Sequence, residues 1–217
     1  MKLRWLGHSV VMLTGSKKIL IDPFLTGNPK AAIAAKDVKE VDYVVVTHGH
    51  SDHLGDAFDI AKRTGATLVS IFEVTSEAGQ KGIAVEPMNI GGSVVSGDVR
   101  FSMVAATHSS PGSSPTGFLI EMDGKTVYHM GDTGLMADMG LLPDFFKIDV
   151  AFVPIGDRFT MGAPSAAAAV GLCKPRIAVP IHYGTFPIID QTADRFAELA
   201  RGKAEIRVLQ PGEEFEI

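Results

Sequence analysis

The sequence predicts an α/β protein in which two mixed β-sheets pack face to face and helices cover their outer faces. Short runs of β-branched residues recur along the whole chain, and four stretches with helical character lie between them. A hairpin followed by strand–helix alternation occurs once, and the same succession begins again near Asp98. These two β-rich halves, about 1–97 and 98–217, predict one domain, 1–217, built from two stacked sheets.

The first half is expected to begin with a hairpin. Gly15 and Ser16 lie between its two apolar runs, where a tight turn needs small residues. Apolar residues then recur every three to four positions over 54–63, which predicts a helix, and a weaker helical pattern follows over 73–81. The strands expected in this half cover 10–13, 18–21, 43–46 and 67–71.

The second half repeats this arrangement, with a tight turn expected at Asp123 and Gly124. Helices are expected over 165–173, which is rich enough in alanine to pack close against a sheet, and over 193–200. The segment 111–115 has the composition of a loop and is the candidate for a mobile flap. The strands expected here cover 100–105, 118–122, 126–129, 150–154, 177–180 and 206–209.

Composition and charge exclude several classes of protein. The 217 residues include 20 basic and 25 acidic ones, and a net charge of -5 argues against nucleic acid or an anionic membrane as the partner. No stretch approaches the ~18 uninterrupted apolar residues of a membrane span, and the N-terminal segment lacks a signal-peptide cleavage site. A single cysteine is compatible with a reducing compartment. We therefore expect a soluble, cytoplasmic protein.

The strongest chemical signal is the sequence HGHSDH at 48–53, which follows an apolar strand and precedes a predicted helix. Three imidazoles and one carboxylate in six positions would be costly to pack together without a ligand, because they lose solvation and repel one another when protonated. Imidazole nitrogens and carboxylate oxygens are ligands that suit zinc, manganese or iron. The motif therefore predicts a metal site.

Further candidate ligands follow other strands. His108, Asp132 and His182 each come shortly after an apolar run, where loops at one edge of a sheet can meet. Each of them alone is explained as an ordinary polar loop residue. Together with HGHSDH they predict one site assembled from several loops.

In order and spacing, HGHSDH with His108, Asp132 and His182 resembles the metallo-β-lactamase superfamily of binuclear hydrolases. Three further segments, WLGHS at 5–9, YHMGDT at 128–133 and PIHYGTF at 180–186, resemble a branch of small metal-dependent hydrolases similar to ascorbate-6-phosphate lactonase. The resemblance implies a four-layer αββα sandwich and two divalent metal ions per chain, with zinc or manganese favoured over iron. It also implies a division of ligands: His48, His50 and His108 on the first ion, Asp52, His53 and His182 on the second, and Asp132 bridging both.

Other polar residues are candidates for supporting roles. Asp52 is also expected to orient the attacking hydroxide or to relay its proton. His8 is either an edge or core histidine, or a group that contacts the substrate or acts as a general acid. Asp22 either accepts a ring N–H from a ligand histidine or starts a turn before proline. Arg158 and Thr160 either bind an anionic group of the substrate or belong to an ordinary loop.

The function that follows is hydrolysis of a small ester, lactone or phosphorylated metabolite by a hydroxide that bridges two metal ions. Asp52, Asp132 and His8 are the expected catalytic residues. A phosphodiesterase or nuclease of the same fold is one alternative, and a non-catalytic metal-dependent sensor is another. An oxygen-reducing role is disfavoured, because flavin-linked diiron relatives carry an acid at a histidine of the first motif, whereas His50 and His53 are both present. The resemblance also raises the prospect of a homo-oligomer.

Overall fold

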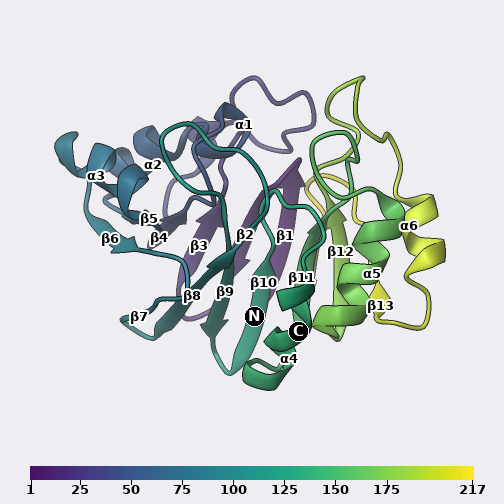
Figure 1. Cartoon of the computed structure of the whole chain (residues 1–217). Helices are drawn as coiled ribbons and strands as arrows, with labels where there is room; N and C mark the ends of the chain where they lie inside the picture. The colour runs from purple at the N-terminus through teal and green to yellow at the C-terminus, as the bar shows by residue number, and fades with distance from the viewer.

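The computed structural model describes residues 1–217 and contains two seven-stranded sheets that pack against each other (Figure 1). In the first sheet the strands lie in the order β14-β1-β2-β3-β4-β5-β6. β14, β1, β2 and β3 pair antiparallel, and β3 to β6 pair parallel. The bounds are β1 Lys2–Gly7, β2 Val10–Thr14, β3 Lys18–Ile21, β4 Tyr43–Val45, β5 Thr67–Ile71, β6 Val85–Met88 and β14 Glu214–Glu216.

The second sheet repeats this mixed arrangement, in the order β13-β12-β11-β10-β9-β8-β7. β7 to β10 pair antiparallel through hairpins, and β10 to β13 pair parallel. The bounds are β7 Ser93–Ser96, β8 Val99–Ala105, β9 Thr116–Met122, β10 Lys125–His129, β11 Val150–Pro154, β12 Ile177–Ile181 and β13 Glu205–Ile206. β7 lies before residue 97 and β14 returns to the first sheet, so sheet membership follows the two sequence halves only approximately.

Helices cover the outer faces (Figure 1). α2 and α3 pack on the first sheet, whereas α5 packs on the second sheet and against α6. The alanines of α5 are buried, as its composition predicts for close packing on a sheet. None of the helices is both long and apolar enough to span a membrane. The bounds are α1 Ser51–Leu54, α2 Ala57–Thr64, α3 Phe72–Gln80, α4 Leu142–Phe145, α5 Ala163–Cys173 and α6 Asp194–Leu199, with short 3-10 helices at Ala35–Asp37 and Ala137–Leu141.

The prediction of one helix over 54–63 is wrong, because the structure has two helices there, α1 and α2, and α1 already begins at Ser51. Gly55 ends α1 with a φ of 40°, and a Cβ atom there would lie 2.6 Å from the carbonyl oxygen of Pro23. The break lets the chain pass close to the loop after β3. As a result, Asp52 and His53 lie on a helical turn rather than on an extended loop.

A core of 60 buried hydrophobic residues fills the space between and around the sheets. In the first sheet β1, β3 and β4 run in the same direction, and in the second sheet β8, β10, β11 and β12 do. Residues that follow β4, β8, β10 and β12 come together, so the carboxyl ends of these strands lie at one edge of the sandwich. The predicted strand over 206–209 shortens to β13, and β1, β6, β7 and β14 are strands that the apolar pattern did not predict.

Candidate metal centre

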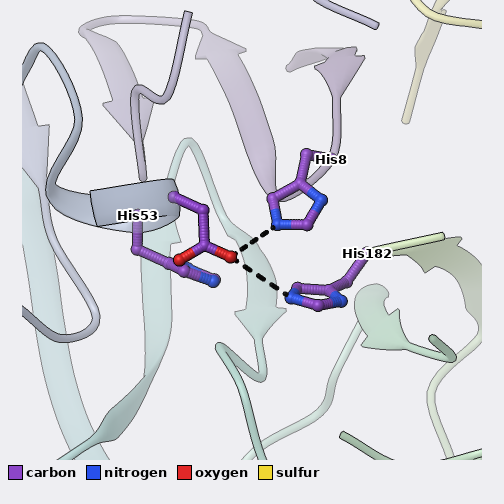
Figure 2. Close-up of side chains that lie close together, drawn as sticks. His8, His53 and His182 are labelled. Atoms are coloured by element: carbon purple, nitrogen blue, oxygen red, sulfur yellow. Dashed lines mark hydrogen bonds and ion pairs between the residues drawn. The ribbon is translucent and has the colours of Figure 1, made fainter. Parts of the chain in front are cut away.

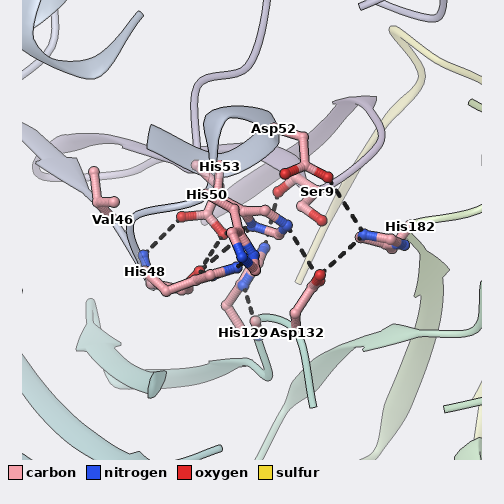
Figure 3. A network of polar contacts seen from close by, with 12 residues as sticks. Ser9, Val46, His48, His50, Asp52, His53, His129, Asp132 and His182 are labelled. Carbon is pink, nitrogen blue, oxygen red and sulfur yellow. Dashed lines mark hydrogen bonds and ion pairs between the residues drawn. The ribbon is translucent and has the colours of Figure 1, made fainter. Parts of the chain in front are cut away.

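All seven candidate ligands meet at this edge. Figure 3 shows His48, His50, Asp52, His53, Asp132 and His182. Their ligand atoms fall into clusters in which every atom lies within 4.8 Å of the others. The clusters are His48, His50 and His108; His48, His53 and Asp132; and His8, Asp52, His53 and His182. The first cluster is the set that the superfamily resemblance assigns to one ion, and the third contains the set assigned to the other.

Asp132 lies between the two groups of histidines. Its Oδ2 is 3.5 Å from Nε2 of His108 and 3.1 Å from Nε2 of His182, which belong to different groups. Its Oδ1 is 3.2 Å from Nε2 of His53. The carboxylate is almost fully buried. This position suits a bridging ligand.

Asp22 and Thr47 fix the ring orientation of two of the histidines. Oδ2 of Asp22 accepts hydrogen bonds from the Thr47 hydroxyl, at 2.7 Å, and from Nδ1 of His53, at 2.8 Å. Because the Thr47 hydroxyl donates its only proton to Asp22, the hydroxyl oxygen accepts a hydrogen bond from Nδ1–H of His48, at 3.1 Å. Both rings therefore carry a proton on Nδ1 and turn the lone pair of Nε2 toward the site. Nε2 of His53 has no partner, whereas Nε2 of His48 lies 2.9 Å from Nδ1 of His50.

Buried atoms without partners test whether these residues fit a metal ion. Nε2 of His53, Oδ1 of Asp132 and Nε2 of His182 are buried and make no hydrogen bond. In particular, the lone pair on Nε2 of His53 faces a carboxylate oxygen 3.2 Å away, and two acceptors at that distance repel each other unless a cation lies between them. The donor set and its orphaned atoms fit divalent ions that prefer nitrogen and carboxylate oxygen.

The electrostatics of the site also attract a cation. Burial alone would lower the pKa of His53, but the carboxylates of Asp132 and Asp22 raise it well above its usual value. The two carboxylates thus favour positive charge at this position, and a divalent ion would supply it. By contrast, burial and the neighbouring His53 lower the pKa of His48 to about 3, so that this ring is neutral and ready to act as a ligand.

His129 supports the loop that carries Asp132. Its ring is fully buried in β10, where Nε2–H donates to the carbonyl of Ser9 at 2.9 Å and Nδ1 accepts from the backbone N–H of Gly131 at 3.2 Å. A Cβ atom at Gly131 would lie 3.0 Å from Cβ of Thr47, and the φ of Gly131 is 63°. The tight approach of this loop to the HGHSDH loop brings Asp132 to its neighbours. These hydrogen bonds give His129 a structural role.

Strained backbone marks the same edge. His8, Asp22 and His182 have φ values of 54°, 45° and 58°, in the left-handed region that residues other than glycine rarely adopt. Each such residue costs of order 1 kcal/mol or more and persists only where its surroundings hold it. Backbone bonds do so here, since the N–H of Asp22 donates to Val45 and that of His182 donates to His8.

The mouth of the site is a cavity of about 330 Å³. Two exposed or half-exposed aromatic rings, Phe159 and Phe186, form its apolar wall, and no lysine or arginine lines it. Ser110, which directly precedes the loop 111–115, contacts the HGHSDH segment, because its Oγ accepts from the backbone N–H of Gly49 at 3.1 Å. The lining residues are His50, Asp52, His108, Ser109, Asp132, Phe159, His182 and Phe186.

The structure does not bring every predicted residue into this mouth. Arg158 is exposed outside it, with its guanidinium 5.8 Å from the centre of the Phe159 ring. The hydroxyl of Thr160 is directed to the backbone of Met161, at 3.4 Å. His8 is fully buried behind Asp52 and does not line the mouth. Asp22 is buried against His53, the position expected for a partner of a ligand histidine.

The sequence argument gave no role to Thr47, Thr185 or Phe186. Thr47 and Thr185 act through contacts with residues distant in the chain, and threonine is too common at strand ends to signal such a role by itself. Phe159 was also given no role, although it is half exposed and lines the mouth.

Known proteins share this arrangement. Residues 17–183 match the family described as "Beta-lactamase superfamily domain". A UPF0173 metal-dependent hydrolase of Thermococcus kodakarensis is 47% identical over 224 residues, which cover 100% of this chain and 99% of that protein. The metallo hydrolase Igni18 from Ignicoccus hospitalis is 39% identical with a TM-score of 0.93, over 100% of this chain and 98% of that chain.

A more distant structure, an isothiocyanate hydrolase from Delia radicum gut bacteria, has a TM-score of 0.80 at 18% identity, over 100% of this chain and 99% of that chain. At that identity it shows only that the fold is shared. The comparisons confirm the superfamily that the motifs predicted, together with the fold of two mixed sheets and outer helices. The chain belongs to the β-lactamase superfamily and, within it, to the UPF0173 metal-dependent hydrolases.

Proposed function

We propose that this metal-dependent hydrolase uses two divalent ions to cleave a small ester, lactone or phosphorylated metabolite. The observation that carries the proposal is the set of buried, unpartnered atoms on His53, Asp132 and His182 between two groups of imidazoles. In such a site, a pair of ions lowers the pKa of a shared water toward ~7 and polarises the electrophilic oxygen of the substrate.

The residues of the chain would divide the remaining work. His48, His50 and His108 would hold the first ion, Asp52, His53 and His182 the second, and Asp132 both. Asp52 has a partly exposed carboxylate that lines the mouth, so it is placed to orient the attacking hydroxide and to accept its proton. Although burial alone raises its pKa, the hydrogen bond from His8 and the charge of His53 lower it below its usual value, which keeps Asp52 ionised.

The mouth limits the class of substrate. A volume of about 330 Å³ is at the lower end of the range for small-molecule sites, which is roughly 300–1,000 Å³. The lining has no basic side chain to follow a phosphodiester backbone, so it favours a compact metabolite over a nucleic acid. Phe159 and Phe186 would shield the apolar part of such a substrate from water.

Metal content tests the proposal first. Protein purified without chelator should contain close to two zinc, manganese or iron ions per chain, measured by elemental mass spectrometry against chain concentration. The protein is then stripped, reloaded with each metal and assayed with panels of esters, lactones and phosphoesters. Fewer than two ions after equilibration with excess metal would refute the binuclear centre. Two ions without turnover of any panel member would favour a metal-dependent sensor.

A further inference from the structure

His8 and Thr185 form a buried connection to Asp52 that the ligand set does not include. Nε2 of His8 lies 3.2 Å from Oδ2 of Asp52, and Nδ1 lies 2.9 Å from Oγ1 of Thr185. Figure 2 shows His8 beside His53 and His182. Thr185 belongs to the loop after β12, whereas Asp52 lies on α1 of the other sheet's half. The contact thus joins the HYGT segment to the HGHSDH segment through the ring of His8.

Counting protons gives the ring a single tautomer. An ionised carboxylate only accepts hydrogen bonds, so Nε2 of His8 carries the proton that it donates to Asp52. A neutral imidazole that is protonated on Nε2 has its lone pair on Nδ1. The hydroxyl of Thr185 donates to that lone pair at 2.9 Å, in preference to the carbonyl of Tyr183 at 3.4 Å.

The backbone of His8 is fixed as firmly as its ring. Its carbonyl accepts the indole N–H of Trp5 at 2.8 Å and the backbone N–H of His182 at 3.0 Å. The rings of His182, Phe186 and Phe24 surround the imidazole, with centroids 4.0, 5.4 and 5.8 Å away. These contacts maintain the left-handed conformation of His8 and prevent the ring from turning toward the mouth.

This geometry excludes two roles for His8. A metal ligand needs a nitrogen whose lone pair is free to face the ions, and Nε2 of His8 is already bonded to Oδ2 of Asp52. A group that contacts the substrate must be reachable from the mouth, and His8 is fully buried. The hypothesis that His8 is a general acid acting on the substrate is therefore replaced by one in which it acts through Asp52.

We propose that His8 is a positioning residue: the Thr185 hydroxyl sets its tautomer, and its Nε2–H holds one oxygen of Asp52, so that the carboxylate keeps the orientation required to bind the second metal ion. This inference rests on the proposed function, because it takes Asp52 as a ligand. Outer partners of this type typically contribute 10- to 100-fold in metal affinity or activity when they are removed.

Three variants test the connection. His8→Phe keeps a buried ring without the donor, His8→Gln restores an N–H near the position of Nε2, and Thr185→Val removes the hydroxyl with little change of shape. Thr75→Val is the control, since the Thr75 hydroxyl is also buried but bonds only to the backbone of Ile71 and Phe72 on α3. Metal affinity is measured by competition with a chelating dye, and kcat and KM are measured with the best panel substrate.

We expect His8→Phe and Thr185→Val to lower the affinity for the second ion by roughly tenfold and to lower kcat. KM should stay unchanged, because neither residue lines the mouth. His8→Gln should recover most of both losses, and Thr75→Val should change neither. Wild-type affinity and kcat in a folded His8→Phe protein would overturn the proposal. A KM increase without a change in metal affinity would do so as well, because it would place His8 on the substrate.

A second measurement separates this inference from the proposed function. In the metal-free protein, ¹⁵N NMR of the His8 ring should show the proton on Nε2, and the Thr185→Val variant should lose that preference. A proton on Nδ1, or a His8 nitrogen shifted directly by added metal, would refute the positioning role even if the centre binds two ions. If the wild type binds fewer than two ions, the proposed function fails, while the tautomer still decides the role of Thr185.

Discussion

Replacing Asp22 by Asn should stop His53 from acting as a metal ligand, although Asp22 is not itself a proposed ligand. The substitution keeps the size of the side chain, and asparagine tolerates the left-handed backbone that Asp22 adopts. The amide oxygen can still accept the N–H of Thr47, which donates to Oδ1 at 2.8 Å. At the position of Oδ2, however, an NH₂ group would face Nδ1–H of His53 at 2.8 Å. To avoid two opposed donors, His53 must move its proton to Nε2, where the lone pair for the metal is lost.

The size of the effect follows from the bond that is exchanged. A hydrogen bond to an ionised acceptor contributes roughly 1.5–3 kcal/mol, and each 1.4 kcal/mol corresponds to about tenfold in affinity. The affinity for the ion bound by His53 should therefore fall by about 10- to 100-fold in Asp22→Asn, the range typical of lost outer partners. kcat measured at limiting metal should fall in parallel and recover partly when excess metal is added.

Dye competition on metal-free protein measures this change directly. Asp149→Asn is a suitable control, because Asp149 is also largely buried and accepts a backbone N–H, from Thr126 at 3.0 Å, but lies at the opposite end of β11. The control variant should lose stability and keep its metal affinity. If folded Asp22→Asn binds both ions as tightly as the wild type, the argument that Asp22 selects the tautomer of His53 is refuted.

Three further outcomes are expected. Asp132→Ala should abolish turnover and reduce the metal content while circular dichroism shows the fold retained; a fully active, metal-counted variant would exclude the bridging role. Phe159→Ala should raise KM for esters with an apolar group by about fivefold with little effect on kcat, since a half-exposed ring contributes about 1 kcal/mol; an unchanged KM would remove the ring from the binding surface. Burial raises the pKa of Cys173 to about 12, so the thiol stays protonated at pH 8 and forms thiolate only as the pH approaches that value. A disulfide reagent should thus label no cysteine in the native protein at pH 8 and one per chain in denaturant, and rapid native labelling would contradict this burial.

The gathering of the candidate ligands could be predicted from sequence because metal binding places unusual demands on residue type. HGHSDH puts four titratable groups in six positions directly after a buried strand, and few structural roles require that composition. The strands before His108, Asp132 and His182, which are β8, β10 and β12, run in the same direction, and this explains why the three residues reach the same edge. At these positions the residue types and the direction of the strands both indicate the same site, so the sequence alone was enough to predict where the side chains gather.

The supporting residues could not be predicted, because their roles depend on neighbours that only the folded chain supplies. His8 and Thr185 are 177 residues apart, and neither shows in its own segment that it bonds to the other. The same reason explains the divided helix, since the apolar spacing over 54–63 continues through Gly55 and gives no sign of the close carbonyl of Pro23. β6 was missed because its sequence VEPM includes a proline, which an edge strand tolerates and an interior pattern does not predict.

The division of the ligands between the two sheets ties metal binding to the packing of the hydrophobic core. His48, His53 and their neighbours follow the first sheet, whereas Asp132 and His182 follow the second, so each ion would link the two layers. An ion at about a thousand times its Kd adds roughly 4 kcal/mol to the free energy of unfolding. Coupling of this kind is reciprocal. The rings of Tyr43 and Phe101 meet across the two layers, with their centroids 5.2 Å apart. A substitution that loosens this contact should therefore weaken metal binding from a distance. Core variants of this enzyme can thus be mistaken for variants of its metal site.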